Sequence, residues 1–291
     1  MTVASGTGRG GDVSRAGPQR LARTCRTALP SLSFVVHSFN RCRNVEALAR
    51  GLARLPSEEI IVCDDGSIDG SREAWTRNLS GPDGWIVLSN DLHEIRILDR
   101  AIAMSKGDVV CLVQDDDRIP PGEAWLEPCL AAFRRHPELA VVGGFMGFNG
   151  FDTDPSKVER IWEEGPFRFV EHVNIGPFFV RRSAYRALGG WDFSFAAAGE
   201  PGICFDNELC LRCWMNGMAV GYLFVPFKGP ARTYSRNGGT DLFMPSMRRA
   251  NQLRNEALLF AKYNAHADRI AERVRRANAT LGEGNHLRLA P

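Results

Sequence analysis

The chain has 291 residues and a formal net charge of +2, with 44% hydrophobic and 24% charged residues. These proportions are those of ordinary globular proteins, so they exclude a wholly disordered chain, a collagen-like repeat and a coiled coil. The length suits one large domain or two small ones.

The charge is unevenly distributed along the chain. Residues 1–30 carry five Arg against one Asp, and residues 248–276 carry eight Arg or Lys against three acids, so the part between them is net negative. A nucleic-acid site needs clustered cations, which argues against nucleic acid as the partner of this acidic body. A phosphorylated ligand would need a metal ion there. We divide the chain into a flexible basic tail (1–30), a folded domain (31–247) and a basic C-terminal helix and tail (248–291).

Cysteine usage and hydropathy favour a cytoplasmic protein. Cys63 and Cys111 lie inside apolar runs, where a reduced thiol behaves as a small buried hydrophobe. Cys210 and Cys213 form a CxxC, but no second ligand pair follows at zinc-finger spacing. No apolar stretch approaches the ~18 residues that cross a bilayer, and the first 30 residues have no signal-peptide core. We therefore expect reduced thiols, no transmembrane segment and a cytoplasmic location.

From residue 31 onward, short apolar runs alternate with helical patterns. The predicted strands are 32–37, 59–67, 85–89, 108–114, 139–146 and 219–226, and the predicted helices are 44–54, 70–79, 94–105, 122–135, 205–218 and 248–276. Strands separated by helices of this length imply parallel pairing with right-handed crossovers. The expected fold is an α/β fold with an open, mainly parallel sheet flanked by helices.

The last predicted helix, 248–276, has a modest apolar stripe at Ala250, Leu253, Ala257 and Ala261. We expect it to dock on the body and to turn a cationic face to solvent. The alternative is that this face makes a peripheral contact with a membrane or a partner.

Three of the predicted strands end in polar residues. These residues are His37–Arg41, Asp64–Ser67 and Gln114–Asp117. In open α/β sheets ligands bind outside the carboxyl ends of the strands. The three polar segments should therefore converge on one edge.

Asp115, Asp116 and Asp117 follow an apolar run directly. Like charges this close raise one another's pKa, and a divalent metal ion removes that penalty. Carboxylate oxygens suit Mg²⁺ or Mn²⁺. The alternative is a solvated acidic turn that caps the next helix. Because Asp64 and Asp65 end a neighbouring strand, we favour the metal.

Other acids at this edge also have two interpretations. Asp65 could accept hydrogen bonds from a nucleobase or a ribose, or cap the next helix through an Asx turn. Asp206 and Glu208 lie two residues apart at a predicted helix start, so at most one should point into a site. Either could instead complement the helix dipole.

Five segments, taken in this order, resemble the family 2 glycosyltransferases, which are inverting enzymes with a GT-A fold. They are SFVVHSFNR, IIVCDDGSIDGS, GDVVCLVQDDDRIPP, ALGGWDFSF and FDNELCLRCWMNGM. The resemblance implies metal-dependent transfer of a sugar from a nucleotide-diphosphate sugar, with a UDP sugar favoured, to an acceptor hydroxyl. Mg²⁺ or Mn²⁺ is the implied cofactor. The chain lacks the QxxRW of processive synthases, so we expect the addition of one sugar.

The resemblance also implies roles for particular residues. The implied nucleotide-binding residues are His37, Phe39, Asn40, Arg41, Asp65 and Asp115. Asp116 is the implied metal ligand. Because Gln114 replaces the family's usual first aspartate, the motif could shift by one residue and make Asp117 the ligand instead.

On the acceptor side, the resemblance implies that Asp206 is the general base and that Trp191 and Asp192 line the acceptor. Phe205 replaces the glutamate that usually precedes the base. The Ala-Arg-Asn of the family appears as 97–99, Ile-Leu-Asp, so a phosphate-facing arginine must come from Arg96 or Arg100 or be missing.

Two rival functions stay open. A sugar-phosphate nucleotidyltransferase has a similar sheet, but its phosphate loop after the first strand is Gly-rich and HSFNRCRN has no glycine. Gln114 and Phe205, which replace usual family residues, keep open a non-catalytic nucleotide- or sugar-binding protein. Hydrolysis of a donor would distinguish an enzyme from such a binding protein.

Overall fold

The computed structural model describes residues 28–79, 83–90, 93–152, 154–196, 200, 202–227, 245–282 and 287. Nearly all of the predicted basic tail, residues 1–27, lies outside these residues.

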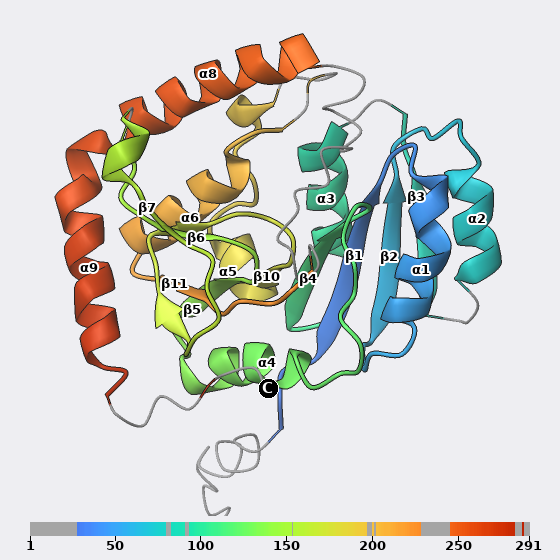
Figure 1. Cartoon of the computed structure of the whole chain (residues 1–291), viewed down its shortest axis with the longest axis horizontal. Coiled ribbons are helices and arrows are strands. Elements are labelled where there is room, and N and C mark those ends of the chain that lie inside the picture. Colours follow the sequence, from blue (N-terminus) through green and yellow to red (C-terminus); the bar gives the residue numbers. More distant parts are fainter. Residues whose placement is uncertain are drawn as a thin grey trace, which may run out of the picture.

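Strands and helices alternate through the first half of the fold, as the sequence predicted (Figure 1). The elements are β1 (Leu32–Ser38), α1 (Cys42–Leu52), β2 (Glu59–Asp64), α2 (Ser71–Asn78), β3 (Gly84–Leu88), α3 (His93–Met104) and β4 (Val109–Gln114). The four strands are parallel, in the order β3-β2-β1-β4. Since β1 pairs on both sides and its residues are mostly buried, it forms the centre of this half.

The second half continues the same sheet. Its elements are α4 (Leu126–Arg135), β5 (Leu139–Gly143), β6 (Gly147–Asn149), the 3₁₀ helix η1 (Pro155–Lys157), β7 (Glu159–Ile161), β8 (Arg168–Phe169), β9 (His172–Val173), β10 (Phe178–Arg181), α5 (Arg182–Ala187), the 3₁₀ helix η2 (Phe193–Phe195), α6 (Phe205–Met215) and β11 (Ala219–Tyr222). Among the described residues, an eight-stranded sheet has the order β3-β2-β1-β4-β10-β5-β11-β8, and β7-β6-β9 form a smaller antiparallel sheet. The fold is therefore α/β with a mainly parallel sheet, as expected.

Strand β10 brings the two halves together at one edge. It runs antiparallel to β4, with Phe178 opposite Leu112 and Arg181 opposite Val109. Because the two strands run in opposite directions, the residues just before Phe178 lie beside the residues that follow β4. The carboxyl edge of β4 is thus shared by both halves of the chain.

Two predicted helices are shorter than expected because of glycines with positive φ. Helix α4 begins at Leu126 rather than at 122, since Gly122 has φ 72° and the prolines before it disfavour helix. Helix α6 ends at Met215, and Gly217 follows it with φ 77°, a usual helix stop.

The C-terminal segment corrects one prediction. Residues 248–276 do not form a single helix but belong to α8 (Pro245–Tyr263) and α9 (Ala267–Ala279), joined by the 3₁₀ helix η3 (Asn264–His266). In Figure 1, α8 crosses the top of the molecule and α9 descends along its left side. The bend lets both helices bury residues against the body, which a straight helix of this length could not do.

The expected apolar stripe of α8 is also wrong. Leu253 is 53% exposed, whereas Asn251, Asn255, Leu259 and Tyr263 are buried. These four residues follow i, i+4 spacing, so they form one face. That face needs hydrogen-bonding groups because it lies on backbone carbonyls and on a buried acid, as described below.

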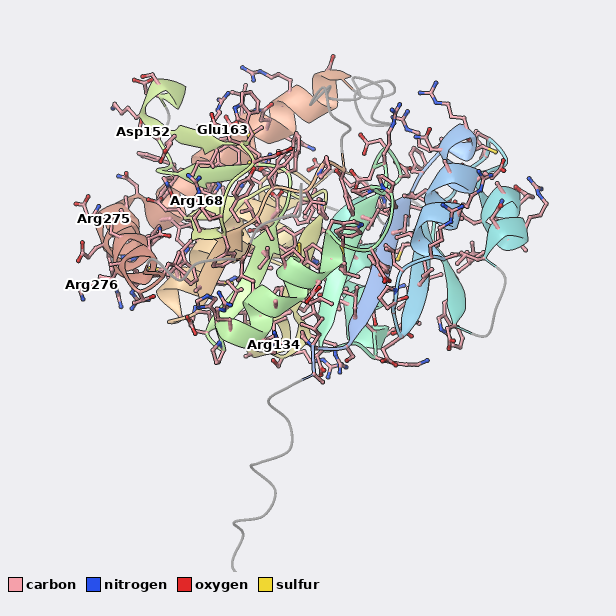
Figure 2. All side chains as sticks on the ribbon, turned by 60° about the horizontal axis from the view of Figure 1, so that its bottom comes forward. Arg134, Asp152, Glu163, Arg168, Arg275 and Arg276 are labelled. Carbon is pink, nitrogen blue, oxygen red and sulfur yellow. The ribbon has the colours of Figure 1, made fainter. Side chains whose placement is uncertain are left out.

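Helix α9 buries Ile270 and Val274, and Arg273 donates to the Trp214 carbonyl, whereas Arg269, Arg275 and Arg276 are exposed. Figure 2 shows Arg275 and Arg276 on the outer side of the protein, and both form ion pairs with Glu272. None of the described helices combines the length and apolar character needed to span a membrane.

Gly107, just before β4, provides a test of how closely β4 approaches β1. A Cβ atom at Gly107 would lie 2.5 Å from the backbone nitrogen of Ser33. Neither backbone can yield easily, so Gly107→Ala should lower the free energy of unfolding by about 2 kcal/mol, measured by urea denaturation. At Gly165 the added Cβ would meet only the end of the Arg168 side chain at 3.3 Å. Gly165→Ala is therefore the control, and equal loss in both variants would contradict this packing.

Candidate active site

Asp115 joins the ends of β1 and β4. Its carboxylate accepts a hydrogen bond from the Phe39 N–H at 2.7 Å, and its carbonyl accepts one from the Asn44 side chain at 3.0 Å. Burial raises the pKa of Asp115 to about 7, against the lowering effect of the Phe39 N–H, and the negative charge of Asp116 raises it further. Two predicted nucleotide-binding residues, Phe39 and Asp115, are thus in direct contact.

The loop after β1 is bonded to the loop after β2. Asn40 has φ 53°, its N–H donates to the Ser67 hydroxyl at 3.0 Å, and its side-chain oxygen accepts from the Ile68 N–H at 2.8 Å. The Arg41 N–H donates to the Ser71 hydroxyl at 2.9 Å. These bonds hold the two polar segments together, as the sequence predicted.

The remaining predicted nucleotide residues lie at the same edge. His37 is opposite Cys63 of β2 and Gln114 of β4. Asp65 is buried, and its carboxylate accepts a hydrogen bond from the Ser89 hydroxyl at 2.6 Å. Arg41 is also buried, at 3% exposure. At this edge, His37 at the end of β1 is therefore partly exposed, whereas Arg41 and Asp65 are buried.

Asp116 and Asp117 have different surroundings. Asp117 is buried, its carboxylate accepts from the Gln114 N–H at 2.7 Å, and its own N–H donates to the Gln114 carbonyl at 3.0 Å, so it caps the turn after β4. Asp116 is partly exposed.

These residues fit a divalent cation that is shared with a ligand. The described residues contain no group of three or more His, Cys, Asp or Glu arranged to hold a metal by themselves. Mg²⁺ and Mn²⁺ sites often use one or two carboxylates together with water and phosphate oxygens. Burial is the main cause of the raised pKa of Asp115, and the neighbouring charges of Asp116 and Asp117 add to it against the lowering effect of Arg41, so a cation bound here would stabilise the ionised carboxylate.

Asp206 lies at the start of α6 and accepts only N–H hydrogen bonds from described residues. Its two carboxylate oxygens accept from the Ile175 and Asn207 N–H groups, both at 2.9 Å. Ile175 precedes β10, so Asp206 lies at the same edge as the residues that follow β4. Burial raises the pKa of Asp206 above the usual Asp value, against the lowering effect of these hydrogen bonds.

Glu208, two residues further, is compensated by cations. It is fully buried and forms ion pairs with Arg212 at 2.9 Å and Lys262 at 3.1 Å. The Tyr263 hydroxyl donates to it at 2.7 Å. Of the two acids at this helix start, Glu208 is bound in a structural network, whereas Asp206 forms no ion pair with the described residues.

The predicted acceptor-side residues lie beside this helix start. Trp191 is 4% exposed, and its ring contacts Phe205, immediately before Asp206, with centroids 4.9 Å apart. The Asp192 carboxylate accepts from Lys262 at 2.5 Å and from Ser194. Although partial burial acts to raise it, these bonds lower the pKa of Asp192 to about 2.

Helix α3 contacts the acceptor side through two residues. The Tyr185 hydroxyl donates to Asp99 at 2.5 Å and accepts from the Trp191 N–H at 3.1 Å. The Arg96 guanidinium lies over the Phe193 ring, 4.7 Å from its centroid. The resemblance offered Arg96 or Arg100 for the phosphates, and Arg96 instead covers Phe193, next to the predicted acceptor residue Asp192.

The sequence analysis missed the contribution of α8. Lys262 and Tyr263 bind Glu208 from more than 50 residues away, and Asn255 binds the segment before α6. Nothing in the local sequence signals these contacts, because they depend on where α8 docks.

Known structures share this architecture. N-acetylgalactosaminyltransferase GalNAc-T7, solved with UDP, GalNAc and Mn²⁺, aligns at a TM-score of 0.53 and 14% identity over 67% of this chain and 43% of its own. The mannosyltransferase PcManGT of Pyrobaculum calidifontis, solved with GDP-Man and Mn²⁺, aligns at 0.51 and 17% identity over 89% of this chain and 77% of its own. This chain thus spans less than half of the first protein. The fold is GT-A, as predicted.

The sequence profile of the family described as "Glycosyl transferase family 2" matches residues 33–189, more than half of the chain. The chain belongs to this family, as the resemblance implied. No curated protein sequence matches it significantly.

The Glu208 network yields a stability prediction. Glu208→Gln removes the buried charge that Arg212 and Lys262 compensate, and it should lower the free energy of unfolding by about 2 kcal/mol. Glu46→Gln breaks only an exposed pair with Arg50 on α1, so it should change stability by less than about 0.5 kcal/mol. Urea denaturation of both variants tests this difference, and an equally small effect of Glu208→Gln would show that the network contributes little.

Proposed function

We propose that the protein is a metal-dependent inverting glycosyltransferase that moves one sugar from a nucleotide-diphosphate sugar to an acceptor hydroxyl. The observation that carries this proposal is that Asp206 has no cationic partner among the described residues, whereas Glu208 has two. A buried carboxylate without a cationic partner among the described residues costs stability, and its raised pKa gives it greater affinity for a proton. Those are the properties of a general base.

Asp206 acts on the acceptor. It takes the proton from the acceptor hydroxyl while the oxygen attacks the anomeric carbon from the side opposite the nucleotide. The Ile175 and Asn207 N–H groups orient the carboxylate during this step. Since the new C–O bond forms on the side opposite the bond to the nucleotide that breaks, this single displacement inverts the configuration at that carbon.

The nucleotide is bound by the edge formed by β1, β2 and β4. Phe39, Asn40 and His37 surround the base and ribose, and Asp65 and Asp115 accept hydrogen bonds from them. The hydrogen bonds between backbone N–H groups and side chains of the two loops fix these groups before the nucleotide arrives. Trp191 and Asp192 belong to the acceptor side.

Asp116 would hold Mg²⁺ or Mn²⁺ at the diphosphate because it is partly exposed, whereas Asp117 is buried and caps its own turn. When bound, the ion neutralises the charge that develops on the departing nucleotide diphosphate. Asp115 and Asp65 remain available to the ribose and the base.

The donor that we propose first is a UDP sugar, because UDP is the commonest carrier in the family. GalNAc-T7 was solved with UDP and PcManGT with GDP-Man, so the donor panel must include both nucleotides. The acceptor is a hydroxyl-bearing molecule.

We also propose a reducing, cytoplasmic location. The seven described cysteines are all free, and Cys63 and Cys111 are buried in the core. Their thiols would stay reduced there without protection.

Asp206→Asn is the direct test of the base. It keeps the shape of the side chain but removes its proton affinity, so release of nucleotide from the matching donor should fall by about 100-fold or more. UDP-glucose, UDP-GalNAc and GDP-mannose are incubated with Mn²⁺, and the released nucleotide is measured by chromatography. The dissociation constant for the nucleotide should stay within about twofold, because the base does not bind it.

NMR of the released sugar should show inverted anomeric configuration. Near-wild-type turnover in Asp206→Asn would refute the base, and a retained configuration would refute the single-displacement mechanism.

A pair of variants tests the metal ligand. Asp116→Asn should weaken Mn²⁺-dependent nucleotide binding by about tenfold or more, since a neutral amide is a poorer ligand. Asp117→Asn should instead lower thermal stability and keep the metal dependence. The opposite pattern, with the Mn²⁺ effect lost only in Asp117→Asn, would make Asp117 the ligand.

A further inference from the structure

The inward face of α8 is polar where it meets the segment before α6. Asn255 is fully buried, and burying an amide is unfavourable unless its hydrogen bonds are made. Its side-chain nitrogen donates to the Phe195 carbonyl at 2.6 Å and to the Ile203 carbonyl at 2.8 Å. Its oxygen accepts from the Arg254 side chain at 3.1 Å. Asn255 thus uses both donors to join two points that are eight residues apart in the chain.

These two carbonyls flank the connection between η2 and α6. Ile203 is followed by Cys204, which has φ 64° and caps α6, and the Glu208 N–H donates to the Cys204 carbonyl at 2.9 Å. Asp206 lies in the same first turn. The position of the Ile203 carbonyl therefore determines where this turn begins and where the Asp206 carboxylate lies.

Helix α8 holds the same region at two further points. Lys262 binds Asp192, before the connection, and Glu208, after it, at 2.5 and 3.1 Å. Arg254 binds Glu200 within the connection at 2.7 Å. One helix thus binds the chain at Asp192, at Glu200 and at Glu208, and we call this segment, 192–208, the acceptor half. None of these contacts involves the nucleotide-binding edge.

We propose that α8 positions the acceptor half, with Asn255 and Lys262 as positioning residues that keep Asp206 in place; this inference rests on the proposed function. It predicts that loss of either residue displaces Asp206 and leaves the nucleotide-binding edge intact. Residues 245–263 lie outside the part of the chain that matches the family profile, as Asp206 itself does.

Amide hydrogen exchange tests the proposal without a known acceptor. The Ile175 and Asn207 N–H groups bind Asp206, whereas the Phe39 N–H binds Asp115 at the other half. In Asn255→Leu, exchange at Ile175 and Asn207 should accelerate by about tenfold, and exchange at Phe39 should stay within about twofold. The control is Gln252→Leu on the same helix, whose side chain donates to Glu256 of α8. It should change none of the three.

A second pair keeps the test decisive if Asn255→Leu does not fold. Lys262→Met should accelerate the same two amides, and Lys262→Arg should restore them. Nucleotide release should fall by about tenfold in Lys262→Met, with the affinity for UDP and Mn²⁺ unchanged. Unchanged exchange at Ile175 and Asn207, or equal acceleration at Phe39, would overturn the positioning role. Failure of the wild type to bind any nucleotide would refute the proposed function instead, and the exchange results would still decide the role of α8.

Discussion

The carboxyl edge of the sheet collects buried acids, and each of them must be compensated. Asp115 is compensated by the Phe39 N–H, Asp117 by the Gln114 N–H, and Glu208 by two cations. Asp206 receives only two backbone N–H groups from the described residues. Buried charge without a counter-charge is costly. Of the two acids at the start of α6, Glu208 has two cationic partners and Asp206 has none among the described residues, so Asp206 is the acid to which we assign the chemistry.

These acids come together at one edge because β10 is antiparallel to β4 and β5. With β10 inserted between β4 and β5, Ile175 and the start of α6 reach the edge where β1, β2 and β4 end. The loops that we propose for the nucleotide come from the first half, and the proposed base comes from the second. Helix α8 then holds the second half through Asn255, Lys262 and Tyr263.

The sequence predicted the parts of this arrangement that depend on local pattern. The alternation of strands and helices to β4 and the convergence of His37–Arg41 with Asp64–Ser67 follow from periodicity and from the geometry of parallel sheets. The residue pattern alone left Asp206 and Glu208 as alternatives, and only the family resemblance implied Asp206, because the cations that compensate Glu208 are distant in the chain. It also misassigned the buried face of α8, since apolar spacing does not reveal that the helix covers carbonyls and an acid.

Calorimetric titration of the protein with UDP, GDP, dTDP and CDP, each with Mn²⁺ and with excess chelator, tests the central claim most directly. The account predicts that one nucleotide binds with Mn²⁺ and that chelator abolishes or strongly weakens this binding. If a folded sample bound none of the four, or bound one equally well in chelator, the carboxylate edge would not be a metal-dependent nucleotide site.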